Sequence, residues 1–128
     1  MSTNELEAYQ DQKRLLLIFA TSITQPAYIE QQTLLQGHEG EGEARDLLVF
    51  HLLGDGISFV AEAQLAAEAV ANLRRRFGVA EAVFTLVLIG KDGTEKWRAG
   101  QPTPLPEIFA KIDSMPMRRH EMADASRK

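Results

Sequence analysis

The stretch "LRRRFGVAEAVFTLVLIGKDGTEKWRAG", Leu73–Gly100, carries most of the information about the fold. It opens on a basic helix end followed by Gly78, a residue type that caps helices, and continues into a β-branched, apolar run over 82–90. Asp92-Gly93 is a hairpin signal, so "EKWRAG" is expected to return as an antiparallel edge strand. We expect a two-residue turn there, with Gly93 at a positive φ.

The residues before this stretch predict two buried strands and two helices. "RLLLIFA" (14–20) and "LLVFHLL" (47–53) are apolar runs of strand length. One helix is expected to begin at Pro26 and to fray or bend at the glycines that precede Asp46. An alanine-rich helix is expected over 61–78, where apolar residues recur at a spacing of four.

A last helix is expected to begin near Pro104 or Pro106, before a frayed tail over 121–128. With an N-terminal extension over 1–13, a single domain then covers 14–120. The element order β-α-β-α-β-β-α predicts an α/β fold with a four-stranded mixed sheet and helices on both faces. Its first two strands form a parallel pair through a right-handed crossover.

Composition and charge exclude several classes of protein. The 128 residues are 45% hydrophobic and 25% charged, which is ordinary for one globular domain. The net charge of −4 argues against nucleic acid as a partner, and the apolar runs are too short to span a membrane. The opening "MSTNELEAYQDQKR" has no signal-peptide pattern, so a cytoplasmic location is expected.

The chain has no cysteine, which removes disulfides, thiolate nucleophiles and cysteine-ligated metals. The three histidines, His38, His51 and His120, are too widely spaced for a zinc site, so neither a metal nor another cofactor is predicted. His51 lies among leucines and is expected to be a hydrogen-bonded core histidine.

The segment "RRFGVAEAVFTLVLIGKDGTEKW" resembles the thioredoxin and peroxiredoxin pattern of helix end, loop, apolar strand and Asp-Gly turn. More closely, "LLLIFA", "RDLLVFHLLGDG", "LRRRFGV" and "IFAKIDSMPMRR" resemble an uncharacterised bacterial family, domain of unknown function 4174 (DUF4174). That family is similar to the peroxiredoxin-like "DUDES" domains of certain secreted vertebrate proteins. The resemblance implies a thioredoxin-like fold and brings no established activity.

The redox residues of that pattern are absent. A thioredoxin opens its first helix with Cys-x-x-Cys, where this chain has "TSITQP" (21–26), and its active-site proline is replaced by Phe84. Neither thiol–disulfide exchange nor peroxidase activity is therefore expected. The Val83–Phe84 peptide is expected to be trans, with the Phe84 ring covering the groove that the active site would occupy.

One ligand site is predicted, and it comprises Thr21, Ser22, Thr24, Phe84 and Thr85. The first strand delivers the hydroxyls to a helix N-terminus, whose positive dipole end favours phosphate, sulfate or a carboxylate. In the alternative, one hydroxyl caps the helix and the others satisfy loop backbone.

The sequence also contains two basic clusters, Arg74–Arg76 and Arg118–Arg119. They could converge into one patch that binds an anionic partner. Arginines in a last helical turn more often complement the helix dipole and stay solvated, which we expect for Arg74–Arg76.

These observations favour a non-catalytic binding or scaffold module for a partner protein or a small anionic ligand. The alternative is a cysteine-free enzyme that uses the hydroxyls at the first helix, or an oxidative-stress-associated relative of peroxiredoxins. A pocket with polar groups beside Ser22 would favour the enzyme, and an exposed apolar patch would favour the binding module. The partner and the oligomeric state are left open.

Overall fold

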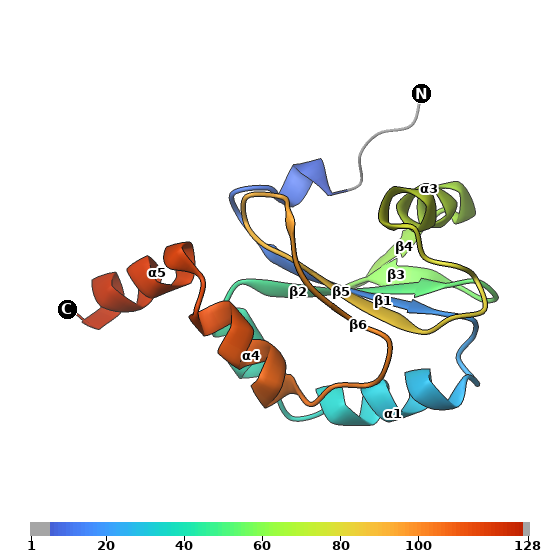
Figure 1. The fold of residues 1–128 in the computed structure, drawn as a ribbon, viewed down its shortest axis with the longest axis horizontal. Coiled ribbons are helices and arrows are strands. Elements are labelled where there is room, and N and C mark those ends of the chain that lie inside the picture. Colours follow the sequence, from blue (N-terminus) through green and yellow to red (C-terminus); the bar gives the residue numbers. More distant parts are fainter. Residues whose placement is uncertain (1–5, 127–128) are drawn as a thin grey trace.

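A computed structural model describes residues 6–126 and arranges them around one six-stranded mixed sheet, in the order β4-β3-β2-β1-β5-β6 (Figure 1). The strands are β1 (Arg14–Ala20), β2 (Leu47–Leu53), β3 (Ser58–Val60), β4 (Ala63–Leu65), β5 (Thr85–Ile89) and β6 (Glu95–Ala99). The helices are the short 3-10 turn η1 (Glu7–Tyr9), α1 (Pro26–Leu35), α2 (Glu39–Ala44), α3 (Ala67–Phe77), α4 (Leu105–Asp113) and α5 (Pro116–Ser126).

The central strands pair as the sequence predicts, but the sheet is wider. β1 and β2 are parallel, while β5 runs antiparallel to β1 and β6 antiparallel to β5. The predicted four-stranded sheet is wrong because the β3–β4 hairpin adds two strands beside β2. The helix predicted over 61–78 accordingly begins at Ala67. Pairing with β3 overrides the helix propensity of Ala63–Leu65, since β-structure depends on what the strand packs against.

The first predicted helix is two helices. α1 ends at Leu35, Gly37 adopts a φ of 84°, and α2 begins at Glu39. The sequence predicts one helix that frays or bends at the glycines. A left-handed glycine instead breaks it once, as glycine does at helix ends, and the chain then resumes a separate helical turn.

Helices cover both faces of the sheet, as predicted: α3 lies on one face, and α1 and α4 lie on the other (Figure 1). Alternate side chains of β1 pack into two cores, one on each face of the sheet, because successive strand residues point to opposite faces. Leu15, Leu17 and Phe19 join the core beneath α3. Leu16 and Ile18 join the core beneath α1 and α4.

The β5–β6 connection differs from the predicted two-residue turn. Gly93 has the expected positive φ, 83°, but the loop comprises Lys91, Asp92 and Gly93. The Gly93 N–H donates to the Gly90 carbonyl (3.0 Å), and the Gly90 N–H donates to the Thr94 carbonyl (2.9 Å). A three-residue loop that ends in a left-handed glycine is a common hairpin connection. Further along the hairpin, a register shift between Leu88 and Ile89 leaves Lys96 without a paired residue on β5.

Ion pairs fasten α5 to the amino end of β1. The Arg14 side chain is fully buried and donates to both carboxylate oxygens of Glu121 (3.2 and 3.1 Å). Lys91 donates to Glu121 (2.6 Å) and to Asp46 (2.7 Å). This anchor explains why α5 continues to Ser126, through residues that the sequence assigns to a frayed tail; residues 127 and 128 lie outside the described range.

The segment before Arg14 also contacts the sheet. Leu6 is buried in the core beneath α3, and the Asp11 N–H donates to the Lys91 carbonyl (2.7 Å). Within residues 6–126, no helix combines the length and the apolar character needed to cross a membrane.

Candidate functional site

Three loops meet where the parallel strands β1 and β2 end. The Gly54 N–H donates to the Ala20 carbonyl (2.9 Å), and the Asp55 N–H donates to the Thr21 carbonyl (2.7 Å). β5 starts at the same edge, since Thr85 pairs with Phe19. Ligands of open α/β sheets bind outside the carboxyl ends of the parallel strands. This edge is therefore the place in the fold where a site is expected.

The three predicted hydroxyls lie here and bond within the loops. Thr21 Oγ1 donates to the Glu81 carbonyl (3.0 Å), and Ser22 Oγ lies 2.9 Å from Thr24 Oγ1. The helix N-cap is Gln25, and no side chain caps α1. The alternative prediction is that one hydroxyl caps the helix and the others bond to loop backbone. The bond to loop backbone is present, and the hydroxyl cap is absent from α1. The ligand-binding role of these hydroxyls stays a prediction.

Phe84 and Thr85 lie below this surface. Among the described residues no peptide bond is cis, so Val83–Phe84 is trans, as predicted. Phe84 is 5% exposed and packs in the core with Tyr28 and Leu105, and Thr85 is 7% exposed. Phe84 is thus a core residue, and the covering of a groove by its ring stays a prediction. The structure brings Thr21 to the loop before Phe84, but it does not gather all five predicted residues around one opening.

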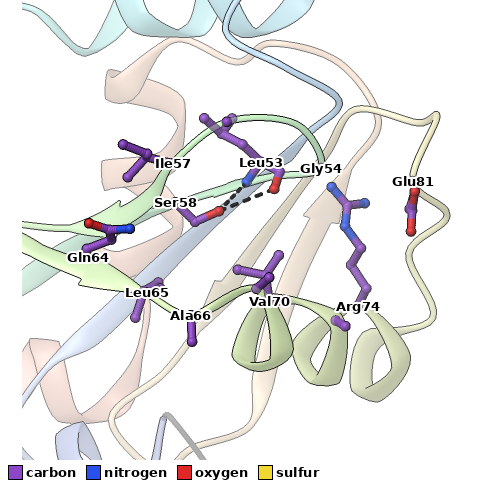
Figure 2. A pocket seen from close by; sticks show the side chains of 13 residues that line it. Leu53, Gly54, Ile57, Ser58, Gln64, Leu65, Ala66, Val70, Arg74 and Glu81 are labelled. Carbon is purple, nitrogen blue, oxygen red and sulfur yellow. Dashed lines mark hydrogen bonds between the residues drawn. The ribbon is translucent and has the colours of Figure 1, made fainter.

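A cavity of about 330 Å³ lies beside this edge, between α3 and the β2–β3 loop with its hairpin (Figure 2). Its apolar wall includes Leu53, Ile57, Leu65 and Val70, and its polar side chains are Ser58, Gln64, Arg74 and Glu81. Ser58 Oγ bonds to the Leu53 N–H (2.8 Å) and to its carbonyl (3.3 Å). An apolar cavity with a few convergent polar groups is typical of small-ligand sites.

Arg74 supplies the positive charge of the cavity. Its side chain reaches from α3 toward Gly54 (Figure 2) and is 6% exposed, so the predicted solvated arginine is wrong at this position. Arg74 Nη2 donates to the Ala20 carbonyl (2.8 Å) and Nη1 to the Ala80 carbonyl (3.0 Å). Burial lowers the pKa of the guanidinium, and the Glu81 carboxylate opposes this shift.

The sequence contains a signal for this burial. Val70, Leu73 and Phe77 lie on the face of α3 that packs against the sheet. Arg74 follows Val70 by four residues, so helical periodicity places it on that same face. The run of three arginines obscures the signal, because Arg75 and Arg76 are exposed as expected.

Exposed apolar side chains surround the edge. Ile23 (62% exposed), Ile57 (61%) and Val83 (50%) come from the three loops that meet there. They account for most of the large apolar side chains that the described chain exposes; the others are Ile29 and Met117. Gathered apolar exposure is typical of interaction sites.

The model of the family described as "Domain of unknown function (DUF4174)" matches residues 5–121. The chain belongs to this family. It is 30% identical over 121 residues to Sushi repeat-containing protein SRPX2 from Xenopus laevis and 28% identical over 120 residues to SRPX2 from Homo sapiens. It is 28% identical over 136 residues to Coiled-coil domain-containing protein 80 from Danio rerio. No solved structure matches the chain significantly.

These relatives are much longer than the DUF4174 chain. The matches cover 92%, 91% and 94% of this chain but only 26% of either SRPX2 and 16% of the coiled-coil domain-containing protein. The chain therefore spans about a quarter or less of each. The resemblance stated above is thus confirmed at the level of the family.

The histidines of the DUF4174 chain lie apart from the cavity polar groups. His51 Nδ1 bonds to the Tyr28 hydroxyl (3.0 Å), and its ring stacks on Phe59 (4.3 Å between centroids). Burial lowers the pKa of His51 to about 4. This confirms a hydrogen-bonded core histidine. His38 instead pairs with Glu41 (2.7 Å). Over residues 6–126, no group of three or more His, Asp or Glu residues is arranged to hold a metal.

The two arginine clusters do not form one patch. Arg74 bonds to the carboxyl end of β1 at Ala20, whereas Arg118 lies near Glu121, which bonds to Arg14 at the amino end of β1. Arg118 is paired with Asp113 (3.1 Å). The two clusters therefore lie near opposite ends of β1, and of these arginines only Arg74 lines the cavity.

Proposed function

We propose that this DUF4174 domain is a non-redox binding module with a thioredoxin-like fold, and that its ligand occupies the cavity between α3 and the β2–β3 loop. The cavity carries the proposal: it combines an apolar wall with convergent polar groups at the carboxyl ends of β1 and β2. The thioredoxin-like assignment is supported by the strand order β2-β1-β5-β6, in which only the first pair is parallel.

Four further observations support a binding role over catalysis. The chain has no cysteine, and Thr21, Ser22 and Thr24 use their hydroxyls in loop hydrogen bonds. The domain also matches a limited part of longer proteins of two different names, which suits a module that is reused in different surroundings. Ile23, Ile57 and Val83 offer a rim where a larger ligand or a partner protein would gain contact area.

The proposal is tested by filling the cavity. Ala67 is exposed in the first turn of α3 and lines the cavity, so Ala67→Trp should block it without disturbing the core. Glu68→Trp is the matched control, because Glu68 is exposed in the same turn and does not line the cavity.

The measurement is an NMR screen of a fragment library containing neutral, cationic and anionic compounds. Compounds that shift the amides of Gly54–Ser58 and Val70–Arg74 should bind the wild type and Glu68→Trp alike and lose binding in Ala67→Trp. If no compound of any charge class shifts these amides, or if Ala67→Trp leaves the shifts intact, the cavity is not the site.

A further inference from the structure

In contrast to the other buried arginine, Arg14, which is paired with Glu121, Arg74 makes no salt bridge with any described residue. The Glu81 carboxylate acts on its charge only through longer-range electrostatics. Its two hydrogen bonds go to neutral carbonyls, and its guanidinium lies 5.6 Å from the centre of the Phe19 ring. Buried charges in proteins are normally paired, because an unpaired charge away from water is costly. A guanidinium has five N–H donors, so it keeps donors for an external acceptor.

Gly54 lies against the Arg74 guanidinium. A Cβ built on Gly54 would lie 3.6 Å from Arg74 Nη2 and 3.3 Å from the Thr21 carbonyl. A side chain at this position would thus stand against the guanidinium. Glycine keeps the approach from the β2–β3 loop open, and Arg74 and Gly54 both line the cavity.

The charge and the shape of the cavity restrict the acceptor. The acceptor would face one guanidinium, and the exposed Glu81 carboxylate lines the same cavity. Glu81 would repel a dianion more strongly than a monoanion. Leu53, Leu65 and Val70 continue the wall away from Arg74 and offer contact to apolar carbon. A planar carboxylate matches the guanidinium fork in two parallel hydrogen bonds.

Resting on the proposed function, we infer that the cavity binds a monocarboxylate with an apolar tail: the carboxylate pairs with Arg74 and the tail lies against Leu53, Leu65 and Val70. Such a group is found on free carboxylic acids and at peptide C-termini that end in an apolar residue. The Thr21 hydroxyl donates a hydrogen bond to the backbone carbonyl of Glu81 and so holds this loop. The Glu81 side chain can therefore be changed without removing that bond.

The test uses the whole 128-residue chain and NMR titration with 3-phenylpropionate, with 3-phenylpropanamide as the neutral isostere. The carboxylate should shift the Gly54–Ser58 and Val70–Arg74 amides and bind roughly tenfold or more tightly than the amide, because a charge-assisted pair is lost. Inorganic phosphate should bind more weakly than 3-phenylpropionate. The peptide acetyl-Gly-Leu-Phe, with acetyl-Gly-Leu-Phe-amide as its control, separates the two sources: carboxylate-dependent binding that is tighter than that of 3-phenylpropionate identifies a protein C-terminus, and weaker binding identifies a free carboxylic acid.

Two variants and a matched control locate the charge. Glu81→Gln removes the opposing carboxylate and should tighten 3-phenylpropionate roughly two- to fivefold, the range for a partly solvated charge. Glu62→Gln makes the same change in net charge at an exposed residue that does not line the cavity, and should leave affinity unchanged. Arg74→Gln should abolish the difference between carboxylate and amide.

Equal binding of the carboxylate and the amide, or equal effects of Glu81→Gln and Glu62→Gln, would overturn the inference. If neutral fragments still bind the cavity in the screen described above, the binding module stands and only its ligand class is wrong. If no compound binds there, both fail. Because Arg74→Gln also removes two backbone hydrogen bonds, the Glu81→Gln comparison decides the matter should that variant not fold.

Discussion

His51 is a titratable residue that the fold buries and holds neutral near pH 7. It is 8% exposed, bonds to Tyr28, and has Phe59 stacked on its ring. Burial raises the pKa of Tyr28 and lowers that of His51 to about 4, so both are neutral near pH 7. The folded pKa of His51 lies below its ordinary value of 6.5, so between these values the unfolded chain binds more protons.

Stability should therefore fall as the pH drops from above 6.5 toward 4. For this one group, the free energy of unfolding should decrease by about 2 kcal/mol between pH 7.5 and pH 5. His51→Gln keeps a hydrogen-bonding group for Tyr28 and does not titrate, so it should lack that part of the loss. Urea unfolding of both proteins at the two pH values measures the difference. Parallel losses in wild type and variant would show that His51 is not held neutral.

His51 and Arg74 show which features of single residues could be predicted from the sequence and which could not. Hydrophobic context was enough to predict a hydrogen-bonded core role for His51, because a histidine among leucines in a strand is buried whichever partner it finds. The burial of Arg74 depends on which side of a three-arginine run faces the sheet, and on carbonyls at residues 20 and 80 that are distant in sequence. The helix dipole is enough to predict that Arg75 and Arg76 are exposed, whereas the burial of Arg74 depends on hydrogen bonds to residues distant in sequence.

The β5–β6 hairpin shows the same division at the scale of elements. The Asp-Gly signal located the hairpin and the left-handed glycine, but the turn length was wrong. Asp92 accounts for part of the difference, because its carboxylate accepts bonds from the Thr94 N–H (3.0 Å) and hydroxyl (2.7 Å). The Lys96 ammonium, at 2.7 Å, and then the two Thr94 bonds hold the pKa of Asp92 at about 2. They favour the three-residue loop over the tighter turn.

Gly93→Val should destabilise this hairpin. A β-branched residue at a φ of 83° is strained, and the left-handed conformation costs roughly 1–2 kcal/mol for residues with a Cβ. The free energy of unfolding from urea titration should fall by about that amount. Gly93→Asn is the control and should lose less, because asparagine adopts left-handed backbone more readily. An unchanged midpoint in Gly93→Val would show that the loop does not require glycine.

The β3–β4 hairpin could not be found from local pattern alone. Residues 61–66 are alanine-rich and continue the spacing of α3, so helix propensity and strand pairing compete for them. Pairing wins because β3 covers the outer edge of β2, and Val60 and Ala63 then close a short turn in which Ala61 adopts a φ of 53°. An exposed strand edge is a liability, and this hairpin moves the edge outward to a three-residue strand. The same hairpin supplies a wall of the cavity. A sequence pattern that does not predict the hairpin therefore does not predict the cavity.

At the scale of the whole molecule, β1 joins the two cores. Its side chains alternate between the α3 face and the α1–α4 face, and Leu16, Leu17 and Ile18 are fully buried. Removing the helix from either face would expose half of the same central strand to water. Because the faces share this strand, neither core is expected to survive alone.

The chain should accordingly unfold in one cooperative transition. Trp97 is the single tryptophan and packs against the α1–α4 core, so its fluorescence reports that face. A second protein, Phe77→Trp with Trp97→Phe, places the probe where Phe77 contacts the α3 core. Within each protein, the urea midpoint from fluorescence should coincide with that from far-ultraviolet circular dichroism, as two-state unfolding requires. If the Phe77→Trp probe reports loss of the α3 face at a lower urea concentration than circular dichroism does, the cores are separable. The cavity would then lie on the face that opens first, between α3 and a sheet still held together from the other side.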